Sequence, residues 1–452
     1  MAKRILRKFF FGLLILVGLL LVFLLAAIGL VDYTPAADFE GYKETFNEVK
    51  KITVPGNDSI SGFSVGYSKV NLTPSGPVAL AGYGNRKGKH YSKVADSIFV
   101  RTLVIANGTK KVAIVSADLL LIPPRVSKAL EEQLPSIGYN VQDVFLGATH
   151  THNSIGNWGE GAAGFLYGPY EESMIQFITS KIITSILMAG EHLVEGKLRF
   201  GKIANDTAVD NRLIEGGLED PYLRMLEVTR NDSTKLLLAT YSAHATCLYS
   251  RDLELSRDYP GKFVDDLEES GYEFAMFMAG AVGSHKPGAP EFGWTCFDWM
   301  ADELVASVRE SKGTFKTVKG SALAGLRLPL HLSDPQVKVT PDLKVRSWLF
   351  RSALGEYPVY ITGLKIGDVA LLGVPADFSG EFMPHLDSIS SLQNQRLLVT
   401  SFNGGYIGYL TPQKHYDNKY FETQFMNWYA PGTGEFVRDV MCDALNKMSN
   451  NQ

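Results

Sequence analysis

Residues 143–154 read DVFLGATHTHNS: an apolar run leads directly into two histidines that are separated by one threonine. The run from Asp143 to Ala148 has the length and composition of a buried β-strand. A similar run, Lys111 to Ser116, precedes it, and helical patterns are found at Val126 to Leu134 and Glu172 to Met188. Strand-like and helical segments that alternate in this way predict an α/β fold.

A later pair of segments predicts that the sheet is mixed. Tyr357 to Ile366 and Val369 to Val374 are separated only by Gly367 and Asp368, a good turn for a hairpin. A hairpin joins antiparallel strands, whereas strand–helix alternation favours parallel ones. No linker, low-complexity tract or repeat interrupts the chain from residue 63 onward. We therefore expect one domain over residues 63–452, in which helices flank a mixed sheet.

The composition is that of a globular protein without a nucleic-acid partner. The chain has 452 residues, 45% of them hydrophobic, which is enough to bury a large core. Its 44 Lys and Arg against 48 Asp and Glu leave no basic excess for DNA or RNA. The cysteines Cys247, Cys296 and Cys442 are widely spaced and odd in number, so one disulfide is possible and none is the safer expectation.

The N-terminus predicts a membrane segment. Residues 1–8 carry four basic side chains, and residues 9–31 are apolar or glycine throughout. This pattern predicts a transmembrane signal anchor with a cytoplasmic N-terminus, followed by a stalk over residues 32–62 and an extracytoplasmic domain, periplasmic or extracellular. A cleaved signal peptide is the alternative, because Ala26 and Ala27 lie near the end of the apolar run.

Polar side chains follow several of the apolar runs, where the strands of an α/β sheet would end. Since ligands bind outside strand ends in such sheets, these groups could share one crevice. They are His150, His244, Ser284 with His285 and Lys286, Glu381, Tyr406 and Tyr409.

The histidine pair favours a metal site without proving one. Alternation along a strand puts His150 and His152 on the same side, and imidazole is a common zinc ligand. His244 and Glu381 are natural additional ligands. For a His-x-His pair alone, a hydrogen-bonded structural pair is the alternative.

Six short motifs occur in the order in which a known family has them. They are VGYSKVNLTPSGPVALAGYGN (65–85), ATHTHNSIG (148–156), DNRL (210–213), SAHATCL (242–248), GEFM (380–383) and NGGYIGYLTPQKHY (403–416). Through them, most of the chain after residue 63 resembles the catalytic domain of the neutral, non-lysosomal ceramidases, which are zinc amidases. Members with a C-terminal immunoglobulin-like domain continue well past the point where this chain stops.

The resemblance implies zinc ligands at His150, His244, Glu381 and Tyr409. It also implies that His152 orients water or moves protons and that Arg212 stabilises oxyanion charge, with Tyr406 beside them. Zinc held in this way lowers the pKa of its bound water to about 7, which supplies hydroxide for attack on an amide of a ceramide-like or other N-acyl lipid. The ordinary alternatives are a salt-bridge role for the arginine, a core position for the tyrosines and a helix cap for the glutamate.

The sequence differs from the family at positions that the family uses for its substrate. The segment FMAGAVGSHKPG (277–288) aligns without a gap to the family's active-site serine motif, and Lys286 falls at the serine. Only a shifted alignment saves Ser284 as the functional hydroxyl, and Phe421 stands where the family has tyrosine. A lysine would favour an anionic group. The alternatives are therefore a zinc hydrolase of an ester or anionic substrate, or a degenerate member that binds lipid or a partner without turnover. His285, His385 and His415 are expected to be structural or exposed.

Overall fold

The larger of two main sheets forms the centre of the molecule. The computed structural model describes residues 2–54, 62–108 and 110–449. The larger sheet has the strand order β12-β10-β9-β7-β2-β4-β5-β6, with β14 paired to β7. In chain order its strands are β2 (Phe63–Asn71), β4 (Phe99–Asn107), β5 (Lys110–Ala117), β6 (Val144–Ala148), β7 (Val194–Ala204), β9 (Tyr222–Arg230), β10 (Lys235–Tyr241), β12 (Phe274–Ala279) and β14 (Lys316–Thr317). The pairs β5–β6 and β10–β12 are parallel and the others antiparallel, so the predicted mixed sheet is confirmed.

A second sheet packs against the first. Its order is β15-β18-β19-β21, formed by β15 (Leu323–Pro329), β18 (Tyr360–Ile366), β19 (Val369–Val374) and β21 (Arg396–Ser401). The hairpin predicted around Gly367 is present, and this glycine has a φ of +60°. Apolar residues from both sheets, among them Phe145, Met276 and Leu371, form one buried cluster. Because strands such as β5 and β19 are covered on both faces, they are apolar nearly throughout.

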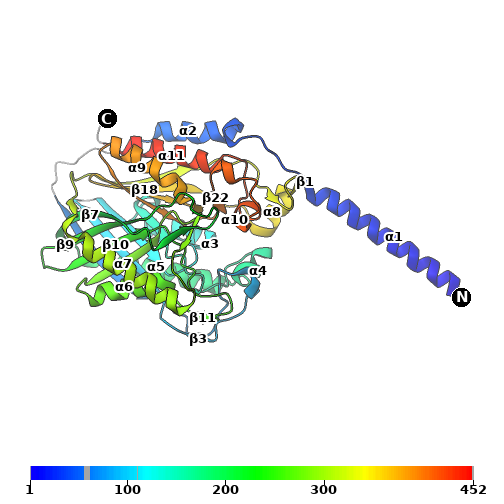
Figure 1. The fold of residues 1–452 in the computed structure, drawn as a ribbon, viewed down its shortest axis with the longest axis horizontal. Coiled ribbons are helices and arrows are strands. Elements are labelled where there is room, and N and C mark those ends of the chain that lie inside the picture. Colours follow the sequence, from blue (N-terminus) through cyan, green and yellow to red (C-terminus); the bar gives the residue numbers. More distant parts are fainter. Residues whose placement is uncertain (1, 55–61, 109, 450–452) are drawn as a thin grey trace.

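Helices cover the outer faces of both sheets, which gives a layered α/β/β/α arrangement (Figure 1). On the larger sheet lie α3 (Pro124–Gln133), α5 (Glu172–Glu191), α6 (Asp258–Glu269) and α7 (Trp294–Glu310). On the second sheet lie α2 (Glu40–Lys51), α9 (Met383–Leu392) and α11 (Thr433–Met448). The predicted α/β class, with helices flanking a mixed sheet, is therefore confirmed.

The N-terminal helix α1 (Ala2–Ala27) projects away from this body (Figure 1). Among the described residues, two helices are long and apolar enough to cross a membrane, α1 from Lys3 onward and α5. The span of α5 is 44% buried, as befits a helix that covers a sheet, whereas that of α1 is 0% buried. The helix ends earlier than the predicted span, because Ile28–Leu30 form the strand β1.

The segment after α1 packs on the body and does not form the predicted stalk. The strand β1 pairs with β17 (Leu343–Val345), and β17 pairs with β16 (Val337–Lys338). The helix α2 then lies against the second sheet's helices, where Val49 is buried and the Thr45 hydroxyl accepts a hydrogen bond from the His331 amide. Apolar side chains on one face of α2 account for this packing. The part of the predicted stalk at 55–61 lies outside the described residues.

A disulfide joins Cys247, just beyond β10, to Cys296 in α7. This corrects the expectation that no disulfide forms: the fold brings the two Cα atoms to 5.3 Å across 49 residues of sequence, which spacing alone does not reveal. Cys442 is free. A disulfide is typical of an extracytoplasmic domain.

Candidate metal centre

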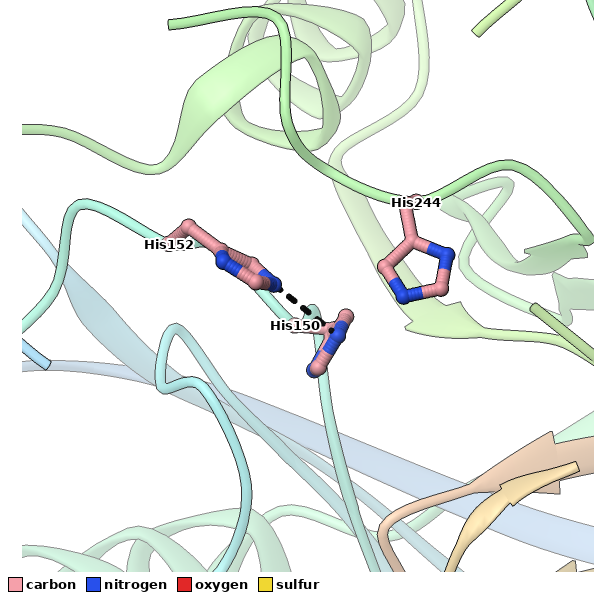
Figure 2. Close-up of side chains that lie close together, drawn as sticks. All are labelled: His150, His152 and His244. Carbon is pink, nitrogen blue, oxygen red and sulfur yellow. Dashed lines mark hydrogen bonds between the residues drawn. The ribbon is translucent and has the colours of Figure 1, made fainter. Parts of the chain in front are cut away.

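Three histidines converge at the ends of two strands of the larger sheet. His150 and His152 follow β6, and His244 follows β10. Figure 2 shows the three rings turned toward one another, and their ligand nitrogens all lie within 4.8 Å. The Nε2 atoms of His150 and His152 are 3.1 Å apart. His150 has a φ of +62°, a conformation uncommon outside glycine, and the ring is stacked on Phe402 with centroids 3.9 Å apart.

Backbone carbonyls fix the tautomers of two of these rings. Nδ1 of His150 lies 2.6 Å from the Leu120 carbonyl oxygen, and Nδ1 of His244 lies 2.7 Å from that of His285. Each Nδ1–H therefore donates outward, and each Nε2 presents a lone pair to the centre. Burial lowers the pKa of both His150 and His244 to about 3, so both rings are neutral and available as ligands at ordinary pH.

Asp377 supplies the carboxylate at this centre. It lies in the strand β20 (Asp377–Phe378), which pairs in parallel with β22 (Tyr409–Leu410). Its Oδ1 is 3.0 Å from Nε2 of His244 and 3.6 Å from Nε2 of His150, while its Oδ2 accepts a hydrogen bond from the Tyr406 hydroxyl at 2.6 Å. The Tyr409 hydroxyl lies 3.1 Å from Nε2 of His244.

The chemistry of these donors fits a metal cation. Two imidazole lone pairs and a carboxylate oxygen face one another, because the Nδ1 protons of His150 and His244 point outward to backbone carbonyls. A cation would be favoured among these buried acceptors, because burial disfavours charging the imidazoles themselves. Neutral imidazole and carboxylate are ligands that zinc accepts.

A cavity of about 520 Å³ opens at His150, His152 and Asp377 and is lined by several of the predicted site residues. Its wall includes His150, His152, Arg212, Tyr406 and Tyr409. Arg212 follows β8 (Val209–Asn211) and forms an ion pair with Glu422, also in the wall, at 2.5 Å.

Glu381 is not at this centre, contrary to its prediction as a ligand. Ser379 begins a short turn of 3₁₀ helix, η7 (Gly380–Phe382), by accepting a hydrogen bond from the Glu381 amide. The turn carries the Glu381 carboxylate to Lys414 at 2.8 Å and to Nε2 of His415 at 2.9 and 3.0 Å. Both of its oxygens are thus engaged elsewhere, and Asp377, four residues earlier, takes the place in the centre.

Ser284 and Lys286 also lie apart from the cavity. Ser284 is buried, and its hydroxyl lies 2.7 Å from that of Ser379. Lys286, in β13 (His285–Pro287), is half-exposed, and its Nζ is 3.6 Å from a carboxylate oxygen of Asp210 on the paired strand β8. Within the described residues, neither side chain lines the cavity.

Several contributors were missed in the sequence. Asp377 and Glu381 both follow the buried strand β19, and Asp377 lies nearer to the end of that strand. This position could have identified Asp377 as a candidate ligand. Phe402, the carbonyl of His285, and Arg86, which donates to the His152 carbonyl oxygen, hold the imidazoles. Nothing in their local sequence marks them, because their partners come from distant elements.

Comparison with known proteins assigns this architecture. Residues 63–270 match a family model described as neutral/alkaline non-lysosomal ceramidase, N-terminal. No curated protein matches the chain. The neutral ceramidase crystal structure from Pseudomonas aeruginosa superposes with a TM-score of 0.74 at 19% identity, covering 87% of this chain and 76% of that one. A structure described as ceramidase complexed with C2 gives a TM-score of 0.74 at 19% identity, covering 86% and 76%. At such identity the likeness shows the fold. Residues 63–270 are therefore similar to the N-terminal part of the neutral/alkaline non-lysosomal ceramidases, and most of the chain has the fold of the Pseudomonas aeruginosa neutral ceramidase.

Proposed function

We propose that the chain is a membrane-anchored, zinc-dependent amidohydrolase that cleaves the amide bond of a ceramide-like or other N-acyl lipid outside the cytoplasm. The observation that carries the proposal is the convergence of His150, His244 and Asp377, of which His150 and Asp377 line the cavity. The apolar helix α1 and the disulfide support the location, and the family match supports the reaction class.

The ligands in this proposal are Nε2 of His150, Nε2 of His244, a carboxylate oxygen of Asp377 and the Tyr409 hydroxyl. When bound there, zinc would polarise the amide carbonyl and lower the pKa of a coordinated water to about 7. Tyr406 is a positioning residue: its hydrogen bond to Oδ2 holds the carboxylate so that Oδ1 faces the histidines.

Two residues act on the substrate. His152 borders the cavity beside His150, so in this proposal its ring takes a proton from the nucleophile and returns it to the leaving amine. The guanidinium of Arg212 is held by Glu422 in the same wall and can stabilise the charge that develops on the carbonyl oxygen.

The lining favours a lipid. Leu120, Leu121, Leu166 and Met426 add apolar surface to the aromatic wall. A second cavity of about 210 Å³ shares Leu121, Tyr167 and Tyr406 with the first and is bordered by Leu330, Phe350 and Trp428, among others. This adjoining space suits an alkyl chain. Lys286 gives no support to an anionic substrate, because it faces Asp210 outside the cavity.

The proposal is tested with the purified full chain in detergent. We expect about one zinc per chain by elemental analysis, fatty-acid release from N-acyl sphingosine, loss of that activity on chelation and recovery when zinc is returned. Protein without zinc, or activity that is indifferent to chelation, would contradict the proposal. Zinc binding without turnover of N-acyl lipids would leave the metal centre but remove the proposed substrate class.

A further inference from the structure

The end of the body from which α1 leaves is joined to that helix without a flexible segment. The amide of Arg346 donates to the Ala27 carbonyl at 2.8 Å, and the indole N–H of Trp348 donates to the Ala26 carbonyl at 2.8 Å. The next residues, from Ile28, pair with β17. The last turn of the anchor is thus bonded directly to the body, so this end of the body must lie at the surface of any membrane that α1 spans.

The same end exposes large apolar side chains, which we call the apolar rim. Trp348 lies on α8 (Ser347–Leu354), Phe165 on α4 (Gly164–Tyr167), and Phe421 begins α10 (Phe421–Gln424). Figure 1 places α4, α8 and α10 at the end of the body from which α1 departs. The rim consists of six side chains that are 38% to 76% exposed: Leu30, Phe165, Leu343, Trp348, Phe421 and Phe425.

Contacts between its elements make the rim continuous. The helix α8 packs on the turn η5 (Gly161–Ala163), which leads into α4. On the other side, the Gln424 side chain of α10 lies 3.5 Å from the Val339 carbonyl, next to β16, so α10 adjoins the hairpin that holds β1. The rim therefore runs from the root of the anchor to α4 on one side and to α10 on the other.

The rim also borders the entrance of the metal cavity. Phe421 belongs to the cavity wall and is 62% exposed, so the cavity reaches the surface at α10. Leu166, the neighbour of Phe165 in α4, lies in the same wall. An exposed apolar patch of this kind marks an interaction surface, and aromatic side chains are typical of the boundary between membrane and water.

We propose that the apolar rim rests on the outer face of the bilayer that α1 spans, and that an N-acyl lipid passes from this bilayer into the metal cavity between α4 and α10. The inference rests on the proposed function for the anchor and for the nature of the substrate. The bilayer is the partner that the structure favours, because the hydrogen bonds at Ala26 and Ala27 bring the rim to it.

The docking of the rim can be measured without any enzymatic activity. The full chain, with Cys442→Ser to remove the free thiol, is reconstituted in phosphatidylcholine vesicles and labelled with an environment-sensitive fluorophore at Phe165→Cys or Phe425→Cys. The matched control is Leu392→Cys, a 72% exposed position at the end of α9, which Figure 1 places on the side of the body away from α1.

We expect nitroxide-labelled lipids to quench both rim positions at least several-fold more than position 392. Equal quenching at all three positions, or no quenching at the rim in protein that floats with the vesicles, would overturn the proposal. Protein that does not float with the vesicles would refute the anchor, and with it the docking that depends on that anchor.

Delivery of the lipid is tested by the double variant Phe165→Ser/Phe425→Ser, since neither residue lines the cavity within the described part of the chain. We expect the ratio of turnover of a long-chain N-acyl lipid in vesicles to turnover of a water-soluble short-chain analogue to fall about tenfold, and Leu392→Ser to leave this ratio unchanged. An unchanged ratio in the double variant overturns the delivery route. If the unmodified protein cleaves neither substrate, the proposed reaction fails while the quenching experiment still decides the docking.

Discussion

The strands β6 and β19 belong to different sheets, and both lead toward the metal centre, but the chain leaves them in different ways. After β6, the backbone stays at the centre, and His150, with a φ of +62°, points its ring inward two residues beyond the strand. After β19, only Asp377 reaches the centre; Ser379 then starts a turn that carries Glu381 to His415. The difference teaches that a polar residue near a strand end becomes a ligand only if the following turn keeps it there.

Long-range pairing decides the second case. Asp377 is held because β20 pairs with β22, which brings Tyr409 alongside it, and because Tyr406 bonds its free oxygen. Glu381 is buried as well, yet its charge is compensated by Lys414 and His415. Two carboxylates four residues apart thus have different tasks, one in the centre and one in the support of the fold.

The largest effect that distinguishes these carboxylates is expected from Asp377→Asn. The asparagine amide has the shape of the carboxylate but lacks the negative charge that would bind the zinc ion together with the two imidazoles. We therefore expect turnover to fall on the order of 10³-fold and zinc to be lost on dialysis. Activity and elemental analysis are the measurements. The matched variant is Glu381→Gln, which we expect to retain zinc. Loss of zinc in Glu381→Gln with retention in Asp377→Asn would reverse the assignment.

A smaller effect is expected from Tyr406→Phe, which removes the hydrogen bond that orients Asp377. Such supporting contacts typically change metal affinity or activity by about 10- to 100-fold. Competition with a chelator should show weaker zinc binding, and added zinc should restore part of the activity. Tyr91→Phe, which removes a hydroxyl bonded to the Gly76 carbonyl, is the control and should change neither quantity. Unaltered zinc affinity in Tyr406→Phe would remove the positioning role.

Glu381→Gln is expected to affect stability. Burial would raise the pKa of Glu381, but the hydrogen bonds from Lys414 and His415 outweigh burial and lower it. A carboxylate with a lowered pKa contributes stability above its unfolded pKa of about 4.3, and this contribution is lost as the pH falls through the folded pKa. We expect the variant to be less stable by about 2 kcal/mol at pH 7, because the buried carboxylate loses its charge-assisted hydrogen bonds to Lys414 and His415.

The pH dependence of urea unfolding checks this stability role. The difference between Glu381→Gln and the unmodified protein should be constant from about pH 6 to 8, should begin to shrink near the unfolded pKa of about 4.3, and should vanish only below the lowered folded pKa. Glu356→Gln is the control, since this side chain is 70% exposed and pairs with Arg351 at the surface. A difference between Glu381→Gln and the unmodified protein that does not shrink at all as the pH falls below about 4 would show that lost charge is not its cause.

The sheet and the histidine pair could be predicted from the sequence, because both depend on residues that are close together along the chain. The apolar runs of β5, β6 and β19 reflect burial on both faces, and the turn at Gly367 reflects a hairpin. His150 and His152 are only two residues apart in one motif, so they remain close together in the folded protein. The same reasoning predicted a stalk over residues 32–62, because the polar surface of α2 is apparent in sequence while the partner of its buried face, α11, lies almost 400 residues later.

The carboxylate and the disulfide could not be derived in this way. Asp377 differs from Glu381 only through the pairing of β20 with β22, and Cys247 meets Cys296 only after α7 has packed beside α6. Each depends on contacts between segments that are distant along the chain. Such contacts leave no periodic pattern, so a short motif can identify the type of site while selecting the wrong side chain.

The smallest effect is expected from Lys286→Ser, which restores the residue type that the family has at the aligned position. The side chain of Lys286 is 42% exposed, and it faces Asp210 outside the cavity. We therefore expect kcat/KM for an N-acyl lipid to change less than about threefold, because an exposed ion pair contributes little. Ser284→Ala is the informative companion: its hydroxyl lies against that of Ser379, and its carbonyl accepts the Arg212 amide. A tenfold rise in activity in Lys286→Ser, with no effect of Ser284→Ala, would contradict this expectation. It would mean that the loop after β12 contacts the substrate during turnover. The C-terminal end of β12 would then contribute to the site together with the ends of β6, β10 and β19.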